Sequence, residues 1–127
     1  MSLPRSPEDT RPVWRRPLEQ GIWLVGVRGR LDHSSVPDLE STLGQLVGGG
    51  HIQLVVDLSQ ATYVNSGGLR TLVSTWRAAR RAGGDLHLCG LSSRLQEIFQ
   101  MVGFDQLFEI HSAPADAVRS LTLSRDA

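Results

Sequence analysis

The sequence predicts a single α/β domain in which helices flank a mixed β-sheet, with elements in the order ββαβαβαβα. Three observations support this prediction. Apolar runs typical of strands alternate with stretches of helical periodicity, the alternation starts after a hairpin, and 127 residues provide one sizeable core rather than two. Such alternation implies right-handed crossovers that place the helices on the faces of the sheet.

The N-terminal part is expected to form a tail and then a hairpin. Residues 1–12 are rich in Pro, Arg, Ser and acidic side chains and offer little to bury, so a flexible tail is predicted. An edge strand over 13–18 and a second strand over 21–30 follow, joined by a turn at 19–21.

The first crossover helix is predicted after a polar break at 29–35. Its apolar residues recur at helical spacing, and the glycines at 48–50 end it. The residues of this apolar stripe are Val36, Leu39, Leu43, Leu46 and Val47.

The stretch from Ile52 to Trp76 is expected to hold the central strand and the second helix. The apolar run at 52–56 predicts a strand covered on both faces, and residues 57–59 predict a polar turn before a second short apolar run. The helix is predicted from i, i+3, i+4, i+7 spacing, which places one face in the core. The residues with this spacing are Leu69, Leu72, Val73 and Trp76.

Four more elements complete the predicted domain. The glycines at 83–84 end the second helix, and a strand, a helix, another strand and a terminal helix follow. The domain is expected to span 13–123 and to leave a C-terminal tail at 124–127. The four elements are predicted at 86–89, from Ser92 or Ser93 to Val102, at 107–110, and from Pro114 to Leu123.

Composition narrows the class of partner and the location of the protein. Thirteen basic residues balance thirteen acidic ones, so no overall charge favours nucleic acid. Three arginines, at 77, 80 and 81, lie near a predicted helix C-terminus, where cations are favourable in any case. No apolar segment is long enough for a membrane span or a signal peptide, so a cytoplasmic protein is expected.

Catalytic and metal-binding patterns are not evident. The histidines His33, His51, His87 and His111 have no paired-ligand spacing, and Cys89 is the only cysteine. The sequence contains no Walker loop, dinucleotide fingerprint or nucleophile elbow. We therefore expect neither an enzyme nor a metal site nor a cofactor.

The start of the second helix is the candidate functional site. Asn65 and Ser66 are both good N-cap residues, and the glycines Gly67 and Gly68 keep side chains off the first turn. The unpaired N–H groups of that turn are therefore expected to be accessible at a partly positive helix end.

Four segments, taken in order and spacing, make the chain resemble the STAS family, the sulphate-transporter and anti-sigma-factor-antagonist domain. The resemblance extends from about Val13 to Leu123 and implies a STAS-like single domain. The segments are Gly29–Asp32, Val55–Ser59, Val64–Leu69 and Gly84–Gly90.

The resemblance implies an antagonist that binds an anti-sigma kinase of GHKL type through the loop and first turn of the second helix, thereby regulating sigma-factor-dependent transcription. In that family the kinase phosphorylates a Ser or Thr at this helix start, which ends binding. A homodimer is a further expectation. The implied partner-binding residues are Asp32, Asn65, Ser66, Gly67, Gly68, Leu69 and Arg70.

The sequence departs from the family pattern at the phosphorylated position. Many antagonists contain Asp-Ser-Ser-Gly-Leu, with the second Ser as acceptor, whereas here Gly67 is at that position and Asn65 replaces the Asp. Either Ser66 is the phosphorylation site, or the domain is not phosphorylated and binds constitutively. Two alternatives of another class remain: an accessory subunit of a lipid-transport ABC system, or a scaffold of a stress-sensing complex.

Overall fold

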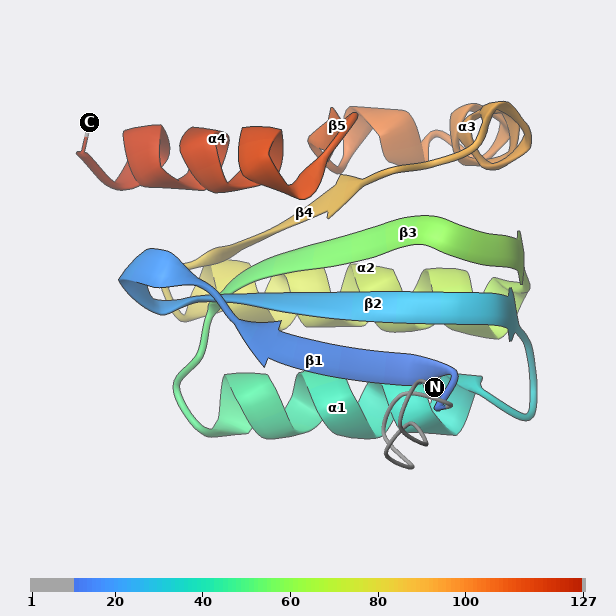
Figure 1. Cartoon of the computed structure of the whole chain (residues 1–127), viewed down its shortest axis with the longest axis horizontal. Helices are drawn as coiled ribbons and strands as arrows, with labels where there is room; N and C mark the ends of the chain where they lie inside the picture. Colours follow the sequence, from blue (N-terminus) through green and yellow to red (C-terminus); the bar gives the residue numbers. More distant parts are fainter. Residues whose placement is uncertain (1–10, 127) are drawn as a thin grey trace, which may run out of the picture.

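A five-stranded sheet in the order β1-β2-β3-β4-β5 forms the centre of the computed structural model, which describes residues 11–126. β1 pairs with β2 in antiparallel fashion and every other neighbouring pair is parallel, so the sheet is mixed (Figure 1). The strands are β1 (Val13–Pro17), β2 (Ile22–Leu31), β3 (Gln53–Val64), β4 (Asp85–Cys89) and β5 (Ile110–His111).

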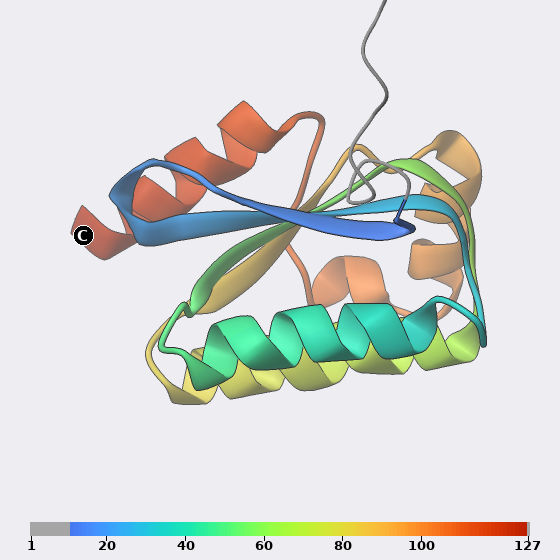
Figure 2. The same ribbon diagram turned by 60° about the horizontal axis from the view of Figure 1, so that its bottom comes forward.

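Helices cover both faces of this sheet, as predicted. α1 and α2 lie side by side across one face, while α4 crosses the other (Figure 2). The order ββαβαβαβα is confirmed, with two short 3-10 turns added. The helices are α1 (Val36–Gly48), α2 (Ser66–Arg81), α3 (Ser93–Met101) and α4 (Pro114–Asp126), and the 3-10 turns are η2 (Glu19–Gly21) and η3 (Phe104–Gln106).

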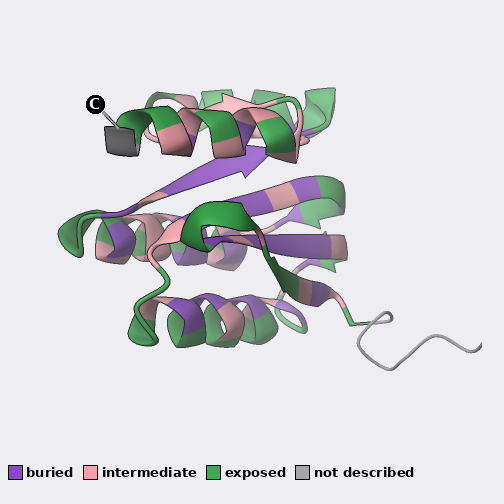
Figure 3. Cartoon of the chain, turned by 60° about the vertical axis from the view of Figure 1, so that its left-hand side comes forward, coloured by how far each residue is buried: buried purple, intermediate pink, exposed green. Residues whose placement is uncertain are grey.

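The sheet separates two apolar clusters because side chains alternate between its faces. The larger cluster joins strand residues such as Leu54 and Val56 to Leu43 of α1 and Leu72 of α2. The smaller cluster lies under α4 and includes Val55, Cys89 and Leu121. Figure 3 shows the resulting pattern, in which the central strands are largely buried and the helices expose their outer faces.

The predicted polar turn at 57–59 is wrong, because β3 continues through it as one strand of 12 residues. Parallel pairing with β2 extends from Ile22 and Gln53 to Leu31 and Val64, with two register shifts at which β3 contains one residue more than the facing segment of β2. Leu58 is fully buried. The polar side chains of this segment therefore belong to a continuous strand, which bulges where it contains the extra residues.

The last strand is shorter than predicted. β5 contains two residues, and the predicted strand at 107–110 shares only Ile110 with it. The apolar residue Phe108 is instead buried in the larger cluster, where its ring meets Trp76 edge-on with centroids 6.2 Å apart. Burial against a helix, rather than strand pairing, explains why this run is apolar.

The described structure begins just before β1 and ends with α4. The backbone N–H of Arg28 donates to the carbonyl oxygen of Pro12 at 2.7 Å, which attaches the chain to β2 just before β1. Residues 1–10 of the predicted tail at 1–12 lie outside the described residues. α4 continues to Asp126, so it includes most of the residues predicted as a C-terminal tail. None of the helices in the described part is long and apolar enough to cross a membrane.

The two sheet edges differ from the buried centre. β1 forms one edge and exposes Arg15, Arg16 and Pro17, while the two-residue β5 forms the other. The carboxyl ends of β2 and β3 lie side by side at the right in Figure 1, where α1 and α2 begin. Side chains from both strands and both helices therefore gather at that end of the sheet.

Candidate functional site

Asn65 connects the end of β3 to the start of α2. Its backbone N–H donates to the carbonyl oxygen of Leu31 at 3.0 Å, and its side-chain Oδ1 accepts from the N–H of Gly68 at 2.9 Å. Asn65 is therefore the N-cap of α2. Ser66 was considered for the same role, but the structure makes it the first residue of the helix, with an exposed side chain.

Gly68 has a packing role rather than the predicted role of exposing backbone. It is buried, and a Cβ added there would lie 2.7 Å from Cδ2 of Leu31 and 3.1 Å from Cγ1 of Val64. Its N–H is bonded to Asn65, whose carbonyl also accepts from Leu69 at 3.1 Å. The expectation of accessible N–H groups across this first turn is therefore wrong for two of its residues.

Gly67 has more space around it. A Cβ added there would lie 3.3 Å from Oδ1 of Asn65 and 3.8 Å from both a guanidinium nitrogen of Arg70 and Cγ1 of Val36. A small side chain fits at this position after a shift of a few tenths of an ångström. Unlike Gly68, Gly67 is not required by the packing of α2 on the sheet.

Asp32 is held rigidly in the turn between β2 and α1. Its Oδ1 accepts from the hydroxyl of Ser34 at 2.7 Å and from the N–H of Ser34 at 3.1 Å, and Oδ2 lies 3.4 Å from Nε of Arg30. The hydrogen bonds from Ser34, led by its hydroxyl, lower the pKa of the Asp32 carboxyl below its usual value. Asp32 therefore presents a fixed, ionised carboxylate beside the start of α1.

Arg30 and Tyr63 belong to the same end of the sheet and were missed by the sequence reasoning. They are register partners on β2 and β3, and the Arg30 guanidinium carbon lies 4.1 Å from the centre of the Tyr63 ring. This distance is typical of a cation–π contact. Tyr63 is 39% exposed, so the pair presents an aromatic surface beneath a positive charge. Only the β2/β3 register, which the sequence does not reveal, identifies the two residues as neighbours.

Together these residues form what we call the α2-start surface. Ser66 and Arg70 are exposed, while Asp32 and Gly67 are half-buried. Two further predicted residues contribute little, because Gly68 is buried and Leu69 packs partly against the core. The surface combines charge, an aromatic ring and hydroxyls, which suits binding to another protein. The α2-start surface consists of Arg30, Asp32, Tyr63, Ser66, Gly67 and Arg70.

A second polar group lies elsewhere, on the face of the sheet covered by α4. His87, Glu109 and His111 each place one ligand atom within 4.8 Å of the others, and they are the metal-type group found among the described residues. The spacing of the histidines in the sequence does not predict a metal site. Strand pairing brings two of them together across 24 positions of sequence.

Comparison with known proteins identifies relatives of the whole domain. The family model described as "STAS domain" matches residues 15–117. The anti-sigma-B factor antagonist of Staphylococcus aureus is 31% identical over 90 residues, which cover 71% of this chain and 83% of that protein.

Solved structures show the same fold at lower identity. An anti-sigma factor antagonist from Mycobacterium paratuberculosis superposes with a TM-score of 0.80 at 24% identity, covering 92% of this chain and 97% of that one. The Bacillus cell fate determinant SpoIIAA in its phosphorylated form gives a TM-score of 0.70 at 15% identity, covering 85% of this chain and 97% of that one.

Proposed function

The chain belongs to the STAS domain family, and we propose on this basis that it acts as an anti-sigma factor antagonist. In this role it binds an anti-sigma factor of the GHKL serine-kinase type through the α2-start surface, and the bound kinase releases its sigma factor. One observation supports this choice of surface above all. The exposed Ser66 begins a helix that the N-cap Asn65 attaches to the end of the sheet.

The chemistry of the α2-start surface fits a protein partner. Tyr63 and Arg30 supply the aromatic and guanidinium groups that are enriched at the centres of interfaces. The rigid carboxylate of Asp32 supplies a charge of opposite sign that orients the partner. Because Ser66 and Gly67 are small, a docked partner reaches the first turn of α2 closely.

The same surface lacks the hydroxyl that the family phosphorylates. Gly67 occupies that position, and Ser66 precedes it by one residue, which turns its side chain by about 100° around the helix axis. We therefore propose that the phosphorylation switch is lost and that the protein binds its kinase constitutively. Control would then act on the amount of protein or on the partner rather than on a phosphate at α2.

Replacing Ser66 by aspartate is expected to weaken kinase binding by at least about 1–3 kcal/mol. The negative charge is tolerated by the domain, because helix N-termini accept anions, but it adds charge and bulk to the docking surface. Ser66→Ala is expected to bind nearly as wild type. Calorimetric titration against GHKL-type anti-sigma kinases encoded in the same genome measures both affinities.

A second serine provides the matched control for this change. Ser124 is exposed in the last turn of α4. That end of α4 and the start of α2 lie at opposite ends of the sheet (Figure 1). Ser124→Asp adds the same charge there and is expected to leave the affinity unchanged. If Ser66→Asp and Ser66→Ala bind equally well, the α2-start surface is not the interface. If none of the kinases binds wild type, the antagonist function itself is rejected.

Replacing Gly67 by serine is expected to create a phosphorylation site. The position accommodates a Cβ at 3.3 Å from the Asn65 oxygen, and the Arg70 guanidinium lies nearby to pair with a phosphate. After incubation with the bound kinase and ATP, mass spectrometry should find phosphate at position 67 of Gly67→Ser and none on wild type.

The Gly67→Ala variant serves as the control, because it adds the same Cβ without a hydroxyl. A phosphopeptide at Ser66 of the wild-type protein would contradict the loss of the switch and would show that the acceptor has moved by one residue. Binding without any phosphate on Gly67→Ser would show that the bound partner does not act as a kinase at this surface.

A further inference from the structure

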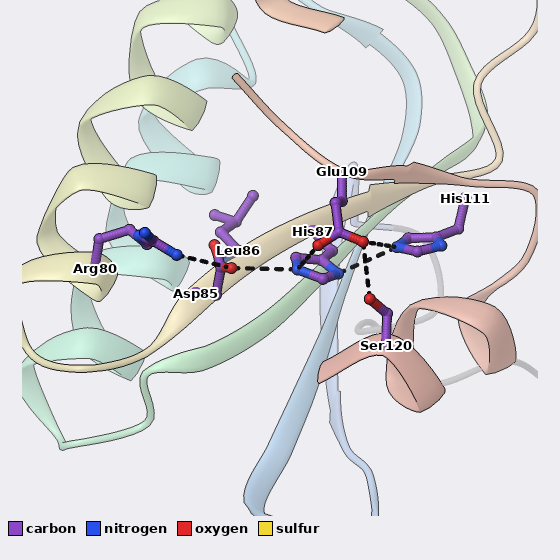
Figure 4. Close-up of polar contacts among 7 residues, drawn as sticks. All are labelled: Arg80, Asp85, Leu86, His87, Glu109, His111 and Ser120. Atoms are coloured by element: carbon purple, nitrogen blue, oxygen red, sulfur yellow. Dashed lines mark hydrogen bonds and ion pairs between the residues drawn. The ribbon is translucent and has the colours of Figure 1, made fainter. Parts of the chain in front are cut away.

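His87, Glu109 and His111 form a compact polar cluster under α4. Nδ1 of His87 lies 3.1 Å from Nε2 of His111, and the two rings stack with centroids 5.2 Å apart. Glu109 places Oε1 at 3.7 Å from Nε2 of His111 and Oε2 at 3.4 Å from Nε2 of His87. Figure 4 shows these three side chains converging, with contacts that continue to Asp85 on one side and Ser120 on the other.

The pairing of β4 with β5 creates this convergence. Leu88 pairs with Ile110 and Cys89 pairs with His111, so His87 lies opposite Glu109. Val55 and Cys89, the register partners of His87 and His111, belong to the apolar cluster under α4, so both histidines lie on that face of the sheet. Backbone register fixes the two histidines relative to each other, and Glu109, the residue just before β5, is held by the hydroxyl of Ser120 on α4.

The contacts of His87 fix which ring nitrogen carries its proton. Nε2 of His87 lies 3.3 Å from Oδ2 of Asp85, and a carboxylate only accepts hydrogen bonds. Nε2 therefore carries a proton, and when the ring is neutral Nδ1 presents its lone pair to His111. That lone pair is the form in which imidazole binds a metal ion.

The outer contacts match those that usually support metal ligands. Metal-binding histidines donate their second N–H to a carboxylate, as His87 does to Asp85, and metal-binding carboxylates are themselves hydrogen-bonded. Here the Ser120 hydroxyl of α4 donates to Oε1 of Glu109 at 2.8 Å. Arg80 of α2 in turn lies 3.4 Å from Oδ2 of Asp85 and holds that carboxylate in place.

We propose that His87, His111 and Glu109 bind a divalent transition-metal ion of the Zn²⁺ class. Two nitrogens bound at about 2.0–2.1 Å to a tetrahedral ion lie about 3.3 Å apart, close to the 3.1 Å between Nδ1 of His87 and Nε2 of His111. His111 supplies its lone pair once its proton moves to Nδ1. The two imidazole ligands favour ions such as Zn²⁺, Co²⁺ or Ni²⁺, whereas Mg²⁺ prefers sites made of oxygen ligands alone.

Exposure of the cluster allows an ion to enter and leaves room for a fourth ligand. His87 is 1% exposed at its side chain, His111 is 16% exposed and Glu109 is 56% exposed. An ion would therefore reach the cluster from the Glu109 side, and water would complete its coordination. By linking β4, β5 and, through Ser120, α4, the ion would stabilise the C-terminal part of the fold.

Titration of the full-length, tag-free protein with Zn²⁺ and Co²⁺ tests this proposal. We expect saturable binding of one ion, a rise in the thermal midpoint with Zn²⁺, and the visible absorption of tetrahedral Co²⁺. Mg²⁺ should produce none of these effects. Glu109→Gln and His111→Gln should each lower the affinity for Zn²⁺ at least tenfold. Asp85→Asn should lower it by about 10–100-fold, which is typical when a residue that hydrogen-bonds a metal ligand is replaced.

The chain supplies a matched control for nonspecific histidine binding. His33 is exposed in the turn before α1, and His33→Gln removes one imidazole without affecting the cluster. Its affinity and Co²⁺ spectrum should match those of wild type. The proposal is overturned if wild type does not bind Zn²⁺ saturably, or if His33→Gln loses as much affinity as His111→Gln. Circular dichroism of each apo variant separates loss of the site from loss of the fold.

Discussion

Replacing Leu72 by aspartate is expected to unfold the domain. Leu72 lies on the inner face of α2 with no exposed surface, within the larger apolar cluster. An unpaired buried charge costs several kcal/mol, a large part of the roughly 5–15 kcal/mol that stabilises a domain of this kind. Far-UV circular dichroism and a thermal melt measure the effect directly.

An exposed leucine provides the control for this experiment. Leu123 on α4 is 63% exposed, so Leu123→Asp makes the same chemical change without burying a charge. We expect it to melt cooperatively near the wild-type temperature. A similar melt for Leu72→Asp would mean that a different face of α2 packs on the sheet.

Replacing Gly84 by alanine is expected to destabilise the fold by about 3 kcal/mol, at the upper end of the range for overpacking. Gly84 lies where α2 leads into β4, and its N–H donates to the carbonyl of Ala79 at 2.8 Å. A Cβ there would overlap the carbonyl oxygen of Ile52, which is itself bonded to the N–H of Asp85. The carbonyl carbon and oxygen of Ile52 are backbone atoms, and the new Cβ is bonded directly to the backbone, so neither side of the clash can rotate away.

A Gly→Ala substitution in α1 should instead raise the free energy of unfolding. Gly44 is an exposed helical residue, and a Cβ added there has no neighbour within 4 Å. Gly44→Ala should stabilise the domain by about 0.5–1 kcal/mol, because alanine loses less conformational freedom on folding than glycine. Urea unfolding of both variants tests the pair. Equal stabilities would mean that the approach of Ile52 to Gly84 is not rigid.

The order of elements could be predicted from sequence because apolar residues recur at different spacings in strands and in helices. The length of β3 could not be predicted in this way. The segment 57–59, with polar residues at 57 and 59, resembles a turn when considered alone, and only the pairing of β3 with its neighbours keeps it in a strand. The run around Phe108 was misassigned for a related reason, since its apolar character serves burial beside Trp76 rather than pairing.

The candidate sites differ in how far sequence could reveal them. The start of α2 was found because Asn65 and two glycines are local signals of a helix start. The role of Gly68 was not, because it depends on the approach of Leu31 from another strand. The proximity of His87 and His111 likewise arises from the register of β4 and β5, which no local spacing encodes.

The edges of the sheet bear on how this protein behaves at high concentration. An unpaired edge strand is a template on which other chains can add and aggregate. Here β1 opposes such addition with two exposed arginines, which repel an identical edge, and with Pro17, which has no N–H to offer. β5 is too short to seed a ladder. Neither edge of the sheet therefore offers a template on which a strand from another molecule can add when the domain is concentrated.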